Sequence, residues 1–254
     1  MFEIKGKYTT ATIMVDEVEP ACLSQIVEMV NNPIFTNPIV IMPDTHAGKG
    51  SVIGFTMPLG EKLLSSIVGV DIGCGMLSFK VNKLIDPPNL NQLIRKRIPM
   101  GHDGHSDPLF KGGDFYELAK RVGCKNALES LGTLGGGNHF IEVGEMNGEY
   151  WITIHSGSRN LGLKTCLYWD GVLEGERLTG YLADMRLAQY YASLNRHIMS
   201  NIILSILGTT STEFIETIHN YIGDDNIIRK GAISSYCGEK SLIPLNPKDG
   251  ILVC

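Results

Sequence analysis

The chain has 254 residues, with 22 Lys and Arg against 27 Asp and Glu, which gives a net charge of −5. Hydrophobic residues make up 43% of the chain, enough for a sizeable core, and this composition excludes an intrinsically disordered protein. The mildly acidic balance excludes a broad basic face, so any contact with nucleic acid must use a local cluster of Lys and Arg. We see no apolar run of signal or membrane-spanning length, and we expect a cytoplasmic protein with no membrane partner.

The first third of the chain predicts strands around one helix. Residues 3–15 alternate loosely and indicate one or two strands. Pro20 suits the first turn of a helix that ends near residues 31–33, and the apolar face of this helix should contain Leu23, Ile26, Val27 and Val30. Short apolar runs then predict buried strands at residues 39–42, 67–70 and 76–81.

The remainder mixes helices with short strands. Helices are predicted at residues 89–98, 115–131 and 179–207. Strands are predicted at residues 140–143 and 151–154, with Asn147-Gly148 as the turn between them, and near residues 227, 232, 242 and 250–254. This order lacks a regular βαβ rhythm, so we expect an α+β or irregular α/β fold in a single domain over residues 1–254.

One of the six cysteines stands out. No two cysteines are close enough for a C-x-x-C pair, and most should be buried free thiols. Cys74, however, follows Asp71 by three residues at the end of an apolar run, with glycines at 69, 73 and 75. A carboxylate and a thiolate aimed at one point suit a borderline divalent cation. The alternative is an ordinary glycine-rich turn with an exposed Asp71 and a buried Cys74.

Three of the seven histidines occur where predicted strands meet turns: His139, His155 and His219. A lone histidine at a strand end is more often structural than a ligand. Three such histidines together with Asp71 and Cys74 favour a metal centre. Five donors are too many for one tetrahedral ion, and they fit two ions that share the thiolate.

Glycine-rich loops provide candidate phosphate contacts. Consecutive glycines in residues 131–138 could expose backbone amides to a phosphate, although the loop lacks the Gly-Lys-Ser/Thr of a Walker A sequence. Arg159 follows Ser156-Gly157-Ser158, and an arginine can pair bidentately with a phosphate. An ordinary polar turn is the alternative for this second segment.

Several strings resemble the RtcB family of RNA-splicing ligases and occur in that family's order. They lie at residues 42–48, 68–76, 131–142, 154–159, 181–185, 195–196, 219–221 and 229–232. The resemblance implies an enzyme that joins an RNA end bearing a 2′,3′-cyclic phosphate or 3′-phosphate to a 5′-hydroxyl end. It also implies GTP and two manganese ions as cofactors, a role in tRNA splicing or RNA repair, and a possible accessory activating protein.

The resemblance assigns roles to particular residues. The metal ligands are Asp71, Cys74, His139, His155 and His219. The residues around the guanine nucleotide are Asn138, Phe140, Glu142, Asn220 and, in the segment 244–247, Asn246. Arg159 corresponds to an arginine of the family that contacts RNA or phosphate.

One family motif has no counterpart among residues 1–254. The resemblance places the guanylylated histidine beyond Cys254, in a Ser-Ala-Pro-His-Gly-Ala-Gly-Arg motif, and no histidine of this chain stands between Pro and Gly. We therefore expect a C-terminally truncated, incomplete RtcB-like domain that has no catalytic residue of its own and is inactive alone. The alternatives are a non-catalytic protein that retains metal and RNA-end binding, and a metal-dependent phosphoesterase.

Overall fold

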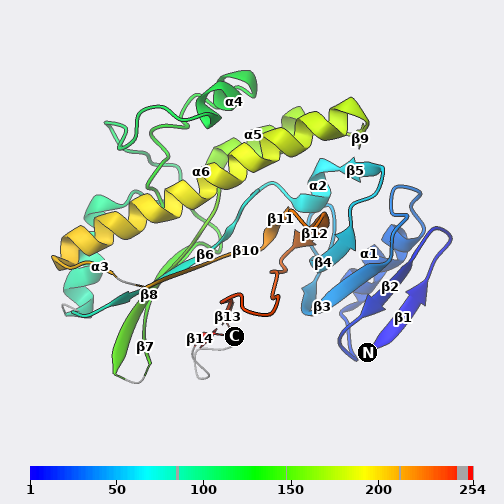
Figure 1. Cartoon of the computed structure of the whole chain (residues 1–254), viewed down its shortest axis with the longest axis horizontal. Coiled ribbons are helices and arrows are strands. Elements are labelled where there is room, and N and C mark those ends of the chain that lie inside the picture. Colours follow the sequence, from blue (N-terminus) through cyan, green and yellow to red (C-terminus); the bar gives the residue numbers. More distant parts are fainter. Residues whose placement is uncertain (84–85, 147, 212, 245–250, 254) are drawn as a thin grey trace. The chain divides into compact units, whose positions relative to one another are not determined.

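A computed structural model describes residues 1–83, 86–146, 148–211, 213–244 and 251–253 (Figure 1). The chain forms two compact units, each built from separated stretches. Unit 1 contains residues 1–72, 162–188 and 219–233, and unit 2 contains residues 73–161, 189–218 and 234–254. The mixture of helices and sheets confirms the predicted α+β class, while the assignment of the whole chain to one domain stays a prediction.

Unit 1 is organised around a six-stranded sheet. Its strand order is β1 (Phe2–Lys5), β2 (Thr10–Ile13), β3 (Ile39–His46), β4 (Ile53–Pro58), β12 (Ile227–Lys230) and β11 (Asn220–Ile222). Neighbouring strands are antiparallel except β2 and β3, which are parallel. Helix α1 (Pro20–Val30) connects this parallel pair. Unit 1 also contains a short antiparallel pair of strands, β5 (Lys62–Leu64) and β9 (Val172–Glu174).

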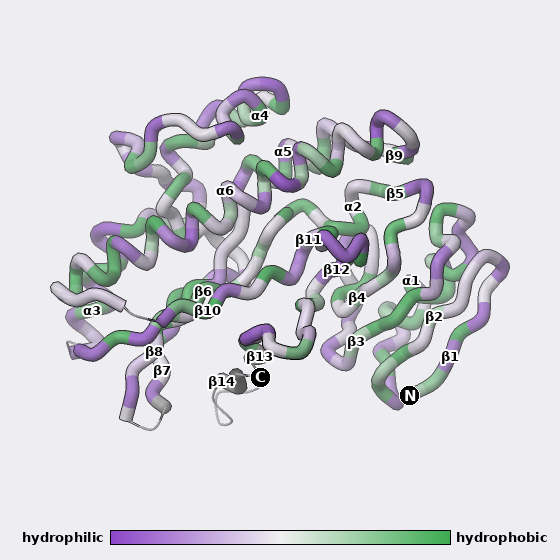
Figure 2. The backbone as a smooth tube through the Cα atoms, in the orientation of Figure 1, coloured by the Kyte–Doolittle hydropathy of each residue, from purple (hydrophilic) through white to green (hydrophobic). Residues whose placement is uncertain are grey.

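Three predicted features of unit 1 were wrong in detail. Helix α1 buries Cys22, Ile26, Met29 and Val30, whereas Leu23 and Val27 are 37% and 43% exposed. Strand β3 carries hydrophobic residues (Figure 2) but is only half-buried, because Ile39 and Ile41 are buried while Val40 and Met42 are exposed. Residues 67–70 do not form a strand, since the helical turn α2 (Ser65–Val68) occupies this segment.

Unit 2 contains an antiparallel sheet of four strands in the order β10 (Phe214–Ile218), β6 (Gly75–Val81), β8 (Glu149–Ser156) and β7 (Phe140–Met146). The second half of α6 (Glu176–Leu207) packs on this sheet, and Met199 and Ile203 share a core with Phe79, Ile152 and Ile154. The unit also holds the strand pair β13 (Leu242–Pro244) and β14 (Ile251–Val253).

The remaining helices are α3 (Pro87–Arg97), α4 (Phe115–Arg121) and α5 (Arg159–Tyr168). Helix α4 ends ten residues before the predicted boundary at 131, α5 was not predicted, and residues 232–233 form no strand. Among the described residues, no helix combines the length and apolar character that crossing a bilayer requires.

The cysteines largely follow the prediction of buried free thiols. Cys22, Cys74, Cys124 and Cys166 are buried, whereas Cys237 is exposed. Cys254 lies outside the described residues, so the strand predicted at 250–254 is seen only as β14 over residues 251–253.

The expectation that the guanylylated histidine lies beyond Cys254 is not tested by the structure and stays a prediction.

Candidate metal centre

Cys74 is held in a narrow space between a helix and a strand. A Cβ added to Gly73 would lie 2.8 Å from the Cα of Gln189 on α6, and the φ of Gly73 is +72°. A Cβ added to Gly75 would lie 2.2 Å from the carbonyl oxygen of Thr217 on β10. Only glycine permits such close backbone approach on both sides. Cys74 directly precedes β6, and its side chain is buried between these two close contacts.

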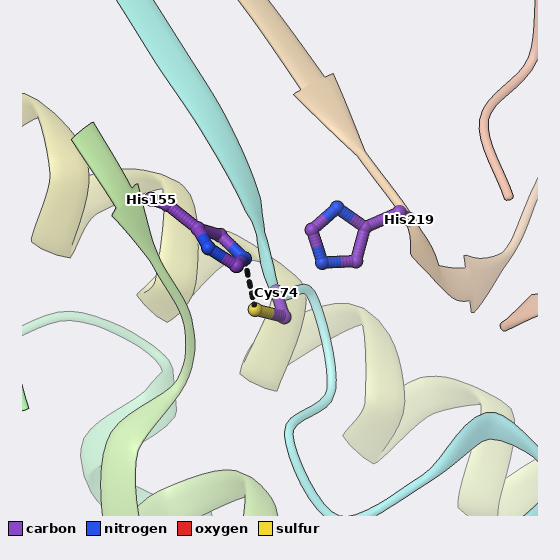
Figure 3. Close-up of side chains that lie close together, drawn as sticks. All are labelled: Cys74, His155 and His219. Atoms are coloured by element: carbon purple, nitrogen blue, oxygen red, sulfur yellow. Dashed lines mark hydrogen bonds between the residues drawn. The ribbon is translucent and has the colours of Figure 1, made fainter. Parts of the chain in front are cut away.

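Two imidazole rings of unit 2 face this thiol. The Sγ atom of Cys74 lies 3.3 Å from Nε2 of His155 (Figure 3). It lies 3.6 Å from Nε2 of His139. His155 lies near the end of β8, where it pairs with Met76 of β6, and His139 directly precedes β7. The ring centroids of the two histidines are 5.4 Å apart. The sheet thus brings together residues that are 65 and 81 positions apart from Cys74 in sequence.

Backbone carbonyls set the orientation of both rings. Nδ1 of His139 lies 2.9 Å from the carbonyl oxygen of Leu134, and Nδ1 of His155 lies 3.1 Å from that of Asn138. A carbonyl can only accept a hydrogen bond, so Nδ1 is the donor in each ring, which leaves Nε2 as the nitrogen that can offer a lone pair to a metal ion. Both lone pairs therefore lie on the side of the ring that faces Cys74.

These donors fit a divalent cation. Sulfur and nitrogen ligands of one tetrahedral ion, with bonds of about 2.3 Å and 2.0–2.1 Å, lie roughly 3.5 Å apart. The observed separations of 3.3 Å and 3.6 Å are close to this value. A hydrogen bond from each Nδ1 to a carbonyl is also the usual arrangement for a histidine that binds a metal.

The other two predicted ligands belong to unit 1. The side-chain amide of Asn220 donates to the carbonyl oxygen of Asp71 at 3.2 Å, so Asp71 lies beside the residue that follows His219. Both residues are tied by short covalent paths to the surroundings of Cys74. Asp71 precedes Cys74 by three positions, and His219 directly follows Ile218, which pairs with Gly75.

The residues predicted around a nucleotide have varied surroundings. Asn138 and Glu142 are exposed, and the ring centroid of Phe140 lies 5.2 Å from that of His155. Asn220 uses its side chain to join Asp71 to Gly231, whose amide donates to Oδ1 at 3.0 Å. Asn246 lies outside the described residues.

The glycine-rich loop at 131–138 is held by other parts of unit 2. The amides of Gly132 and Thr133 donate to Oδ1 of Asn195 at 2.7 Å and 3.1 Å, so these two amides do not point to a phosphate. Arg159 donates to Oγ1 of Thr133 at 3.1 Å and to the carbonyl of Gly101 at 2.6 Å. Its φ of +55° is unusual for a residue with a side chain.

Asn195 and its neighbour Arg196 form one of the strings that resemble the RtcB family, but the sequence assigned neither residue a role in the site. Both side chains are fully buried on α6. The available signal was a polar pair in the middle of a helical pattern that is otherwise apolar on its inner face. Their partners, however, come from loops distant in sequence.

A buried thiol beside two oriented imidazoles on an α+β scaffold defines a candidate metalloenzyme. Residues 25–122 and 112–250 match the family described as tRNA-splicing ligase RtcB, so the chain belongs to the RtcB family of RNA-splicing ligases.

Three relatives illustrate this membership. The chain is 29% identical to the RNA-splicing ligase RtcB of Escherichia coli K12 over 292 aligned positions, which cover 89% of the chain and 72% of that protein. It is 30% identical to the RNA-splicing ligase RtcB1 of another Escherichia coli strain, with the same coverage. It is 25% identical to the tRNA-splicing ligase RtcB of Archaeoglobus fulgidus over 62% of the chain and 45% of that protein.

Proposed function

We propose that this protein acts in RNA ligation that depends on GTP and manganese, as part of RNA repair or tRNA splicing in the cytoplasm. The RNA ends would be a 2′,3′-cyclic phosphate or 3′-phosphate and a 5′-hydroxyl. Family membership supports the reaction class. The observation that carries the site is the convergence of Cys74 Sγ with the Nε2 atoms of His139 and His155.

In this proposal two manganese ions are held by Cys74, His139 and His155 together with Asp71 and His219. When bound, the ions would neutralise charge on a transferring phosphoryl group and lower the pKa of an attacking hydroxyl. The chain's own contribution is orientation. The carbonyls of Leu134 and Asn138 keep each Nε2 lone pair directed at the site, and burial keeps water away from the thiol of Cys74.

The remaining predicted residues would hold the substrates. Asn138, Phe140 and Glu142, with Asn220 and Asn246, are proposed to surround the guanine nucleotide. Arg159 is proposed to contact RNA phosphates, since a guanidinium can pair bidentately with a phosphate. An accessory activating protein is a further proposed partner.

Two alternative functions would use the same site. A non-catalytic protein would bind metal and RNA ends without transferring GMP. A phosphoesterase would release phosphate in the absence of GTP. Because no histidine from Met1 to Cys254 has the Pro-His-Gly context, we also propose that these residues alone form no covalent GMP adduct.

Metal-dependent nucleotide binding tests the proposal. Equilibrium dialysis with manganese, followed by binding of labelled GTP with and without the ion, should show both ligands on the wild-type chain. Cys74→Ser removes a proposed ligand and should weaken manganese binding by at least the roughly 10–100-fold that loss of a ligand-orienting residue costs. Cys166→Ser, which changes another buried cysteine, should leave it unchanged. A wild-type chain that binds neither manganese nor GTP would contradict the proposal, and phosphate release without GTP would favour the phosphoesterase.

A further inference from the structure

Asn195 and Arg196 form a fully buried polar pair in the interior of α6. Burial of a charged guanidinium and an amide is costly unless both groups are well hydrogen-bonded. Neither residue belongs to the proposed set of metal ligands. The hydrogen-bond partners of Asn195 and Arg196 therefore indicate the role of this buried pair.

Arg196 connects the segments that carry Cys74 and His155. Its Nη1 atom donates to the carbonyl oxygens of Gly73 at 2.8 Å and Ser156 at 2.7 Å. Gly73 precedes Cys74, and Ser156 follows His155. One nitrogen atom thus fixes the backbone directly beside both ligands.

Arg196 also reaches β10. Its Nε atom donates to Oε1 of Glu216 at 2.9 Å, and Ser193, one turn earlier on α6, donates to Oε2 of the same carboxylate at 2.9 Å. Glu216 lies on the strand that leads to His219, three residues further along the chain. The ion pair therefore anchors this strand to the helix as well.

Asn195 makes the corresponding connections to the segment that leads to His139. Its Oδ1 atom accepts from the amides of Gly132 and Thr133, and its Nδ2 atom lies 3.1 Å from Oγ of Ser156. The hydroxyl of Ser156 donates to the carbonyl of Leu134 at 2.9 Å. That carbonyl is the one that orients the ring of His139.

We propose that Asn195 and Arg196 are positioning residues that hold Cys74, His139 and His155 in ligand geometry. This inference rests on the proposed metal site. It follows from the placement of a rigid helix behind three loops, each fixed by at least one hydrogen bond to this pair. The planar fork of an arginine holds two carbonyls and a carboxylate in a defined arrangement, which the single flexible ammonium of a lysine does not.

The test compares manganese affinity in conservative variants. Arg196→Lys keeps the charge beside Glu216 but loses the fork, and Asn195→Asp keeps the acceptor but loses the donor. Each should bind manganese about 10–100-fold more weakly than the wild-type chain, measured by equilibrium dialysis below the variant's melting temperature. With Co²⁺ as a probe, the thiolate-to-metal absorption band of Cys74 should also shift or weaken.

Tyr191→Phe is the matched control. Tyr191 lies on the same helix and donates a buried hydrogen bond of 2.6 Å to the carbonyl of Ala127, which lies outside the segments that Asn195 and Arg196 bind. This variant should lose stability and keep full manganese affinity. If Asn195 and Arg196 had only a structural role, Arg196→Lys and Asn195→Asp would behave like Tyr191→Phe, with lower stability and unchanged manganese affinity.

Two outcomes overturn the inference. One is wild-type manganese affinity in both Arg196→Lys and Asn195→Asp, and the other is an equal loss of affinity in Tyr191→Phe. If Arg196→Lys does not fold, Glu216→Gln, at a partly exposed position, removes the charge that holds the guanidinium of Arg196 and should weaken manganese binding in the same direction. A wild-type chain that binds no manganese would instead contradict the proposed function itself.

Discussion

The two glycines that flank Cys74 illustrate how single residues shape the site. Gly75 allows β10 to approach β6 so closely that any side chain at this position would contact the backbone of Thr217. Gly75→Ala should therefore destabilise the fold by about 1–3 kcal/mol, a typical cost of overpacking. Urea unfolding measures this change. Gly144→Ala, on β7 with open space around the added Cβ, is the control and should be close to neutral.

Lys230 is a second residue with an unusual environment. Its ammonium donates to the carbonyls of Lys49 and Ser51, and burial lowers its pKa to about 8, partly opposed by Cys166. Between about pH 8 and the ordinary lysine pKa near 10.4, the unfolded chain binds a proton that the folded chain lacks. The contribution of Lys230 to the free energy of unfolding should therefore rise with pH across this window.

Comparison with Lys230→Met isolates this effect from other titrating groups. The difference in unfolding free energy between wild type and variant should shift in favour of the wild type as pH increases from 8 to 10. A constant difference would show that the folded and unfolded states bind protons equally at this position, and a falling difference would show that the folded state binds the proton more tightly; either would contradict the prediction.

Residue types and their positions predicted part of the site. Cys74 between glycines and the histidines at strand ends 139 and 155 were identified in this way, and the structure brings these three together. The string 195–196 was identified only by its resemblance to the family, and the role of Asn195 and Arg196 could not be predicted by the same reasoning. Their partners lie in loops that are brought to α6 only by tertiary packing, and no local pattern encodes such contacts.

At the scale of elements, long periodic segments were predicted better than short ones. The helix predicted at 179–207 and the strands at 140–143 and 151–154 are present as α6, β7 and β8. The run at 67–70 was wrong because four apolar residues fit a buried strand and a buried helical turn equally well. The boundary near residue 131 was wrong because helical periodicity continued beyond α4 into turns.

The turn between β11 and β12 offers a test at this scale. Asn226 has a φ of +57°, a left-handed conformation that asparagine tolerates better than most residues. Asn226→Ala should lower the free energy of unfolding by about 1 kcal/mol, while Asn226→Gly should change it by only a few tenths. Urea denaturation of both variants measures the two values. An alanine variant as stable as the glycine variant would contradict this explanation of the turn.

For the whole molecule, the proposed ligands are drawn from positions 71 to 219, so a metal site can exist only in the folded chain. Manganese at about 100 times its dissociation constant should stabilise the chain by about 2.7 kcal/mol. For a protein of this size, that corresponds to a rise in melting temperature of roughly 5–10 °C. Thermal unfolding with manganese and with a chelator measures this rise, and equal melting temperatures would argue against a formed site.

The central claim is that the thiolate of Cys74 binds a metal ion beside His139 and His155. Titration with Co²⁺ tests this claim most directly. Wild-type chain should develop a thiolate-to-cobalt charge-transfer band that saturates with added metal and is displaced by manganese. Cys74→Ser should lose this band, while Cys166→Ser should retain it. A band that persists in Cys74→Ser, or wild-type chain that never develops one while it binds the metal, would contradict the account.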